Sequence, residues 1–131
     1  MMQDIEDEFA FLDDWEDRYT HLIELGKAMP KLCDADKTDA NQIQGCVSKV
    51  WLVVNKDQQG KFTFKGDSDA AIVRGLVAVL LRMVNDKTAT QITSIDPAAI
   101  FARIGLADNL SPQRANGLNS MIEYINKTIA A

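Results

Sequence analysis

The feature that most constrains the fold is a long apolar run over residues 70–83, near the middle of the chain. Only Arg74 and Arg82 interrupt it with charge, and it is shorter than the roughly 20 residues that a bilayer span requires. Ser68 or Asp69 can cap a helix, so the pattern predicts an α-helix over 70–85. A helix that is apolar nearly all round is normally buried. We therefore expect a core helix covered by the rest of the chain.

Two strand patterns precede this helix. Residues 50–54 form a β-branched run, and Phe62 and Phe64 alternate with polar residues as in a strand with one buried face. We expect Trp51 and Phe64 to lie in the core. The intervening residues 57–60 predict a hairpin turn in which Gly60 takes a positive φ. A bare hairpin is marginally stable in water, so we expect a third strand, with the segment just before Cys46 as the candidate.

Further helices are predicted on both sides of these elements. Apolar residues spaced by three and four from Trp15 to Met29 predict a helix with Asp13 or Asp14 as its N-cap, after a shorter helical segment near the N-terminus. After the core helix, cap signals predict three more helices, which begin near Thr88, Asp96 and Ser111. The expected fold class is α+β, with a small antiparallel sheet of about three strands packed against several helices.

The charge balance argues against two classes of partner. The 131 residues carry a net charge of -5 without a basic cluster, so the chain has no field that favours nucleic acid or an anionic membrane. The acidic N-terminus lacks the basic and apolar regions of a signal or transit peptide. We therefore expect a single domain over 1–131 that stays in the cytoplasm.

A polar stretch over 31–45 predicts a long loop that ends at Cys46. Loops of this length are uncommon in compact domains unless they are functional or partly disordered. Gly45 allows backbone dihedrals that other residues avoid, so it can place Cys46 at a turn. Two interpretations stay open: a nucleophilic sulfur, or a small buried hydrophobe, as most free cysteines are.

The other reactive residues limit what this cysteine can do. Cys33 is the only other cysteine and His21 the only histidine, so no disulfide framework, Cys-x-x-Cys pair or metal site is expected. His21 lies within a helical pattern and gives no case for a cysteine–histidine dyad. A lone thiolate can still exchange with another sulfur without a metal or cofactor. The cations that could stabilise such a thiolate, if they lie nearby, are Lys49, Arg74 and Arg114.

Four motifs follow one another along nearly the whole chain. They are Ile23-Glu24-Leu25-Gly26; Asn41-Gln42-Ile43-Gln44-Gly45-Cys46 with Ser48 and Val50-Trp51; Gly66-Asp67-Ser68-Asp69-Ala70-Ala71-Ile72-Val73 with Gly75-Leu76; and Leu110-Ser111-Pro112 with Arg114 and Gly117-Leu118. In this order they resemble the SufE/CsdE family of sulfur acceptors. The resemblance implies a SufE/NifU-like fold, related to iron–sulfur scaffold proteins.

The resemblance also implies a chemistry. A pyridoxal-phosphate (PLP)-dependent cysteine desulfurase would dock, and Cys46 would take its persulfide sulfur on a sheltered loop and pass it to an iron–sulfur scaffold or another acceptor. Asp69 matches the family acid that helps hold this loop, and Arg114 matches an arginine near the contact surface. Gln44 and Gly45 belong to the same loop motif. The chain itself would need no cofactor and would not be an enzyme.

Two other functions stay open. The chain could activate the desulfurase by docking alone, with Cys46 merely packed, or it could be a thiol redox enzyme, although no resolving partner for Cys46 is evident. Scaffold function is not expected, because a nascent cluster needs more cysteine ligands than this chain has. Cys33 lies outside the motifs, and we expect it to be a packed bystander.

Overall fold

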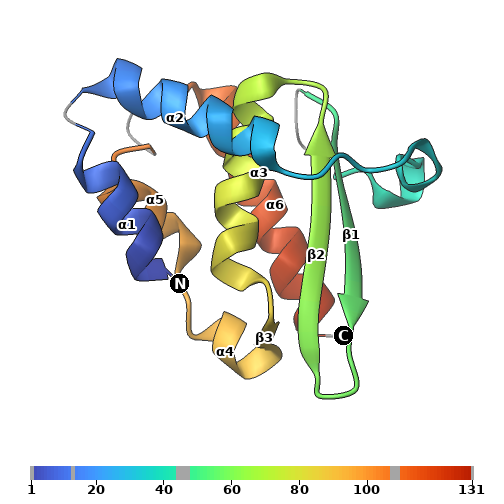
Figure 1. Cartoon of the computed structure of the whole chain (residues 1–131). Coiled ribbons are helices and arrows are strands. Elements are labelled where there is room, and N and C mark those ends of the chain that lie inside the picture. The colour runs from blue at the N-terminus through green and yellow to red at the C-terminus, as the bar shows by residue number, and fades with distance from the viewer. Residues whose placement is uncertain (1, 13, 44–47, 107–109, 131) are drawn as a thin grey trace.

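The computed structural model describes residues 2–12, 14–43, 48–106 and 110–130. Its centre is the core helix α3 (Ala71–Val84), which agrees with the sequence-based prediction. Figure 1 shows α3 running through the middle of the molecule, with the sheet on one side and α1 on the other. Most residues of α3 are buried. None of the described helices combines the length and hydropathy that a membrane span requires.

The second long helix, α2 (Trp15–Ala28), crosses close to α3. The close approach depends on two glycines, one in each helix. A Cβ at Gly75 would overlap the carbonyl of Leu22, and a Cβ at Gly26 would lie 2.7 Å from the backbone nitrogen of Gly75. The backbones therefore pack against each other directly at this crossing, which fixes the C-terminal end of α2 relative to α3.

Asp14 caps α2 as predicted, since its carboxylate accepts a hydrogen bond from the backbone N–H of Asp17 at 2.9 Å. The alternative cap, Asp13, lies outside the described residues. The predicted shorter segment is α1 (Met2–Ala10), whose Ile5 and Phe9 are fully buried. The N-terminal segment is thus a helix that contributes to the core.

The sheet contains the predicted hairpin. Strand β1 (Val50–Lys56) pairs antiparallel with β2 (Lys61–Ser68), with Val50 opposite Ser68 and Lys56 opposite Phe62. In the turn, the Asp57 carboxylate accepts the backbone N–H groups of Gln59 and Lys61, both at 2.9 Å. Gly60 has a φ of 80°. Trp51 and Phe64 are both buried, as expected.

The third strand exists, but its predicted position was wrong. It is β3 (Lys87–Thr88), which follows the core helix and pairs with Lys61 and Phe62 at the far edge of β2. Of the described residues before Cys46, Gln42 forms only an isolated bridge with Trp51. Strand pairing depends on contacts between distant residues, which the local pattern did not contain.

The C-terminal helices start where the cap signals place them. They are α4 (Ala89–Thr93), α5 (Pro97–Arg103) and α6 (Pro112–Ala130). Thr88 and Gln91 form the predicted capping box, Asp96 caps α5, and Ser111 Oγ accepts a hydrogen bond from the N–H of Arg114 at 3.3 Å. In Figure 1, α6 lies behind α3 and β2.

The predicted cap of the core helix was wrong. The chain remains extended through Ser68, and the N-cap residue is Ala70, which supplies no side-chain cap. The side chains of Ser68 and Asp69 instead contact the backbone of Lys49, on the strand-side stem of the loop that carries Cys46. Their role is therefore to join two distant chain segments.

Candidate functional site

Three predicted site residues, Gln44, Gly45 and Cys46, lie outside the described residues. The nearest described residues are Ile43 before them and Ser48 after them. Ile43 is buried, and its backbone N–H donates a hydrogen bond to the carbonyl of Val50 at 2.8 Å. The two stems of this loop, residues up to 43 and from 48 onward, are thus joined at their base.

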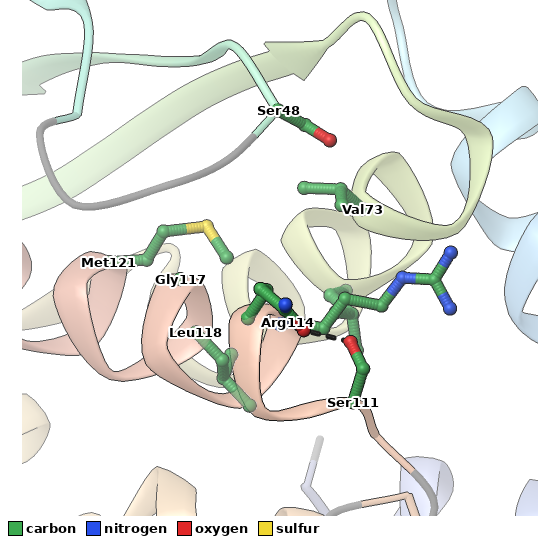
Figure 2. Close-up of a pocket in the computed structure, with 9 residues that line it drawn as sticks. Ser48, Val73, Ser111, Arg114, Gly117, Leu118 and Met121 are labelled. Carbon is green, nitrogen blue, oxygen red and sulfur yellow. Dashed lines mark hydrogen bonds between the residues drawn. The ribbon is translucent and has the colours of Figure 1, made fainter.

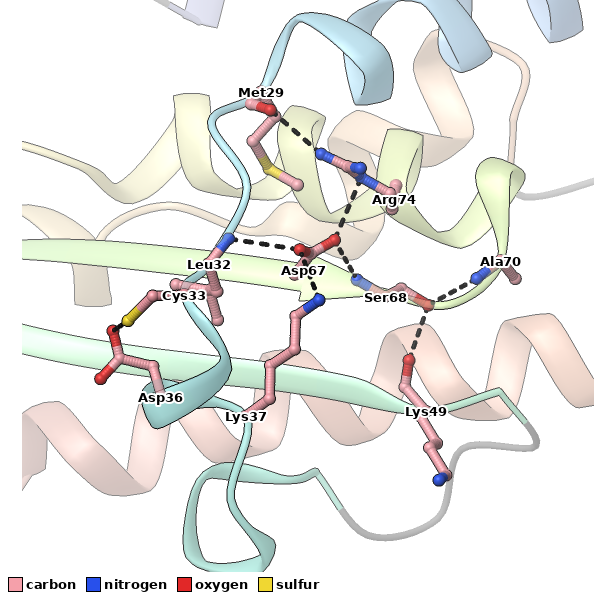
Figure 3. Close-up of polar contacts among 10 residues, drawn as sticks. All are labelled: Met29, Leu32, Cys33, Asp36, Lys37, Lys49, Asp67, Ser68, Ala70 and Arg74. Atoms are coloured by element: carbon pink, nitrogen blue, oxygen red, sulfur yellow. Dashed lines mark hydrogen bonds and ion pairs between the residues drawn. The ribbon is translucent and has the colours of Figure 1, made fainter.

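The outgoing stem is held by the end of β2. Asp69 Oδ1 accepts the backbone N–H of Lys49 at 3.1 Å, and the Ser68 hydroxyl donates to the Lys49 carbonyl at 2.7 Å. The Asp69 N–H donates to the same carbonyl at 3.2 Å. Figure 3 shows the Ser68 hydroxyl between Lys49 and Ala70. Both backbone groups of Lys49 are therefore bound to Ser68, at the end of β2, and to Asp69, the residue that follows it.

The incoming stem is held by a buried carboxylate, Asp67, which is only 2% exposed. One of its oxygens accepts the backbone N–H of Leu32 at 3.2 Å and lies 3.4 Å from Lys37 Nζ. The other lies 3.2 Å from Arg74 Nε and accepts the N–H of Ser68 at 2.8 Å. Figure 3 shows these four groups converging on the carboxylate. The end of β2 thus binds both stems, through Asp67 on one side and Ser68 and Asp69 on the other.

Asp67 is held ionised by its surroundings. Burial alone would raise its pKa, but the N–H groups of Ser68 and Leu32 and the positive charges of Arg74 and Lys37 outweigh burial and lower it. The carboxylate is therefore charged at neutral pH, opposite two cations. The sequence analysis missed this role, because it named Asp67 only as part of the third motif. The available signal was an acid three residues after Phe64, the second of two alternating phenylalanines in a strand pattern.

A hollow of about 400 Å³ lies between α3 and α6, beside the outgoing stem. Figure 2 shows Ser48 on one side of this hollow and Arg114 on the other. Its apolar lining comes from Val73, Leu76, Leu118 and Met121. The structure thus brings Arg114 and the residue two places after Cys46 to one apolar hollow. Asp69 is not among its lining residues and lies at the stem instead.

The structure assigns other roles to two groups that the sequence left open. Arg74 contacts Asp67, and its Nη2 donates a hydrogen bond to the carbonyl of Met29, at the C-terminal end of α2, at 3.0 Å. Its guanidinium is therefore bound by β2 and by the end of α2. His21 lies 3.1 Å from Glu8 and is a satisfied histidine. Among the described residues, no group of three or more His, Cys, Asp and Glu could hold a metal ion.

Cys33 was expected to be packed, and that expectation was wrong. Its side chain is exposed, and the thiol donates to the Asp36 carboxylate at 3.3 Å. It lies just before a single turn of 3₁₀ helix, η1 (Asp34–Asp36), in the incoming stem. A turn on the surface of a long connection has no core into which the thiol could pack.

Comparison with known proteins decides the family. A family model described as "SufE: Fe-S metabolism associated domain" matches residues 3–129. The chain belongs to the SufE family. Two SufE-like relatives, both described as uncharacterized, agree with this. One, from Rhizobium meliloti (strain 1021), is 51% identical over 127 residues, and the match covers 95% of this chain and 91% of the relative. The other, from Rhizobium etli, is 49% identical over 129 residues, and the match covers 96% of this chain and 87% of the relative.

A solved structure supports the fold. The solution structure of a hypothetical protein from Thermus thermophilus matches with a TM-score of 0.78, covering 98% of this chain and 93% of that one. At 15% identity, this likeness concerns the fold alone. Membership in the SufE family associates the protein with iron–sulfur metabolism.

Proposed function

We propose that this SufE-family protein accepts persulfide sulfur from a PLP-dependent cysteine desulfurase onto Cys46. It then passes the sulfur to an iron–sulfur scaffold or another acceptor, and its removal of the persulfide stimulates the desulfurase. The protein would act as a sulfur-transfer accessory rather than as an enzyme. A reducing compartment suits such a free thiol, so we propose action in the cytoplasm, as one domain spanning 1–131.

The observation that carries the proposal is the apolar hollow beside Ser48. A persulfide is readily attacked by other thiols, so a carrier needs a place where solvent reaches the sulfur poorly. The hollow lies next to the outgoing stem and is lined largely by apolar side chains of α3 and α6. Arg114 at its rim supplies a positive charge, which would stabilise a thiolate or persulfide anion nearby.

The two bound stems support the same proposal. Asp67, Ser68 and Asp69 bind backbone groups on both sides of the loop, at Leu32 and at Lys49. A loop anchored at its base on both sides can change conformation without moving the rest of the fold. This arrangement suits a thiol that must be sheltered when loaded and accessible to a partner when it exchanges.

The transfer step requires only the two proteins. The Cys46 thiol first loses its proton to solvent. Its thiolate then attacks the terminal sulfur of the desulfurase persulfide, so that a new S–S bond forms on Cys46. The original S–S bond breaks, and the desulfurase cysteine leaves as a thiolate. No external oxidant or reductant is consumed, because the sulfane sulfur moves between two thiols at one oxidation level.

The alternative function is a binding module that activates the desulfurase by docking, without carrying sulfur. It uses the same surface but gives no role to the Cys46 thiol. The two functions therefore differ in one variant, Cys46→Ser. A carrier loses both labelling and stimulation with this substitution, whereas a docking activator keeps the stimulation.

The test is intact-protein and peptide mass spectrometry after incubation with the cognate desulfurase and free cysteine. We expect a gain of one or more sulfur atoms on Cys46 that a reductant removes. The chain offers a matched control in Cys33→Ser, since Cys33 is exposed and outside the hollow. This variant should label normally, while Cys46→Ser should not.

Two results would contradict the carrier function. One is an unlabelled Cys46 beside a stimulated desulfurase, which would leave docking as the activity. The other is equal labelling of Cys33 and Cys46, which would indicate unselective exchange with exposed thiols.

A further inference from the structure

A second hollow, larger than the one beside Ser48, lies away from the site above. It is an open groove of about 1050 Å³, bounded by the end of α2, by α3 and by the outer edge of β2. Its apolar lining includes Leu25, Met29, Phe64, Ala78 and Leu81. We call it the β2-edge groove. The proposed sulfur transfer makes no use of it.

Part of the groove wall is an unfilled strand edge. Backbone groups of successive residues in an antiparallel strand point alternately toward and away from the neighbouring strand. The backbone N–H and C=O groups of Phe62 and Phe64 point away from β1, since the Phe62 carbonyl accepts the N–H of Asp86 at 2.9 Å. The Asn85 side chain occupies the next place, accepting the Phe64 N–H at 2.7 Å and donating to its carbonyl at 3.1 Å.

The following residue on that edge is Gly66. The same alternation points its N–H and C=O outward into the groove, which Gly66 lines. Among the described residues, neither group has a hydrogen-bond partner. Beyond it, the Leu32 N–H is bound to Asp67. Gly66 is buried, so the edge holds one donor and one acceptor recessed in the lining of the groove, between Asn85 and Leu32.

The charge of the groove is opposite to that of the chain. Lys31, Lys65 and Lys87 line it, and none of the three forms an ion pair within the described residues. Arg82 also lines it but is paired with Glu8 at 2.7 Å. The only acid in the lining is Asp86. In a chain with a net charge of -5, this is a local excess of positive charge.

We propose that the β2-edge groove binds a short, extended, acidic segment of a partner protein. The segment forms a pair of backbone hydrogen bonds with Gly66, places an apolar side chain against the groove floor and directs its carboxylates toward Lys31, Lys65 and Lys87. Addition of a strand to an open edge is a common mode of peptide recognition. Here Asn85 and Leu32 limit the paired stretch to a short one.

The probe is an acetylated, amidated eight-residue peptide of alternating glutamate and valine, titrated into the ¹⁵N-labelled full chain. We expect saturable binding with a Kd below about 1 mM, with the amide resonances of Gly66 and Lys65 shifting most. Added salt should weaken it. The same peptide with lysine in place of glutamate should not bind, and N-methylation of its valines should abolish the Gly66 shift.

Matched variants locate the contact. Lys65→Glu should weaken binding about fivefold, in line with loss and reversal of a surface charge pair. Lys61→Glu is the control, because Lys61 is exposed on the same strand but does not line the groove.

Three results would overturn the proposal. They are no saturable shift at Gly66, equal weakening by Lys65→Glu and Lys61→Glu, and shifts centred on Ser48 and Arg114. A Gly66 resonance that shifts with protein concentration alone would instead assign the groove to a second copy of the chain.

Discussion

Asp67 is the residue whose removal should most clearly test the account of the site. Its carboxylate is 2% exposed and contacts two backbone N–H groups and two cations. Asp67→Ala would leave Arg74, whose side chain is 15% exposed, without its counter-charge. Removing one partner of a buried ion pair costs about 3 kcal/mol or more. We therefore expect the free energy of unfolding to fall by about 3 kcal/mol.

The matched control for this substitution is Asp57→Ala in the hairpin turn. The Asp57 carboxylate also accepts two backbone N–H groups, at 2.9 Å each, but Asp57 is exposed and has no cation partner among the described residues. Loss of such solvent-accessible hydrogen bonds costs about 1 kcal/mol. The difference of about 2 kcal/mol between the two variants measures the effect of burial and charge.

The assay is urea unfolding at neutral pH, followed by tryptophan fluorescence, because Trp51 is a buried residue of β1. If Asp67→Ala does not fold, Asp67→Asn replaces it in the assay. Asparagine keeps the size of the side chain and one acceptor oxygen, so this variant should lose less stability than Asp67→Ala. In a double-mutant cycle with Arg74→Met, the two substitutions should cost less together than the sum of their separate effects. The reasoning is refuted if Asp67→Ala costs no more than Asp57→Ala, or if the cycle is additive.

Three further outcomes are expected. Folding lowers the pKa of Asp67, so the stability that its charge contributes is complete above about pH 4 and is lost as the pH falls through the folded pKa. When unfolding is measured as a function of pH in acid, the free energy of unfolding should therefore fall less steeply for Asp67→Asn than for the parent. Gly75→Ala should destabilise by several kcal/mol in denaturant unfolding, since its Cβ would meet the Leu22 carbonyl, and a loss below about 1 kcal/mol would contradict the backbone contact. Arg114→Ala should leave the unfolding midpoint nearly unchanged yet slow sulfur labelling of Cys46, and normal labelling would remove Arg114 from the proposed site.

The helical part of the fold was readable from the sequence because its signals are local. Asp14, Thr88, Asp96 and Ser111 each cap the helix that they were predicted to cap. A cap acts on N–H groups within three residues of itself, so its pattern is complete in a few positions. The core helix was equally clear, since its apolar run leaves no choice of buried face.

The errors occurred where distant contacts override local preference. Ser68 and Asp69 have the side chains of helix caps, but Lys49, about twenty residues earlier, binds both of them. The place of β3 depends on Asp86, a non-glycine residue with a φ of 62° that turns the chain back onto β2. The sequence near these residues does not indicate the binding of Lys49 or the pairing of β3 with β2.

The candidate site stays a prediction, since Cys46 lies outside the described residues. The sequence indicated Cys46 and the resemblance indicated Asp69 and Arg114, and the structure places Asp69 on the loop stem and Arg114 at the hollow. The buried role of Asp67 was missed, since its partners Leu32, Lys37 and Arg74 come from other parts of the chain. Such a network can be recognised only when those segments are seen together.

The Asn85 side chain has a consequence for how molecules of this protein behave in a crowded solution. An open strand edge tends to pair with edges of other chains and so promotes aggregation. Here the carboxamide of Asn85 satisfies Phe64 as a neighbouring strand would, and β3 covers Lys61 and Phe62. What remains open at Gly66 is one residue wide and recessed. One short segment can pair there but a long ladder cannot start, so this edge of β2 can accept a partner without promoting extended pairing with further copies of the chain.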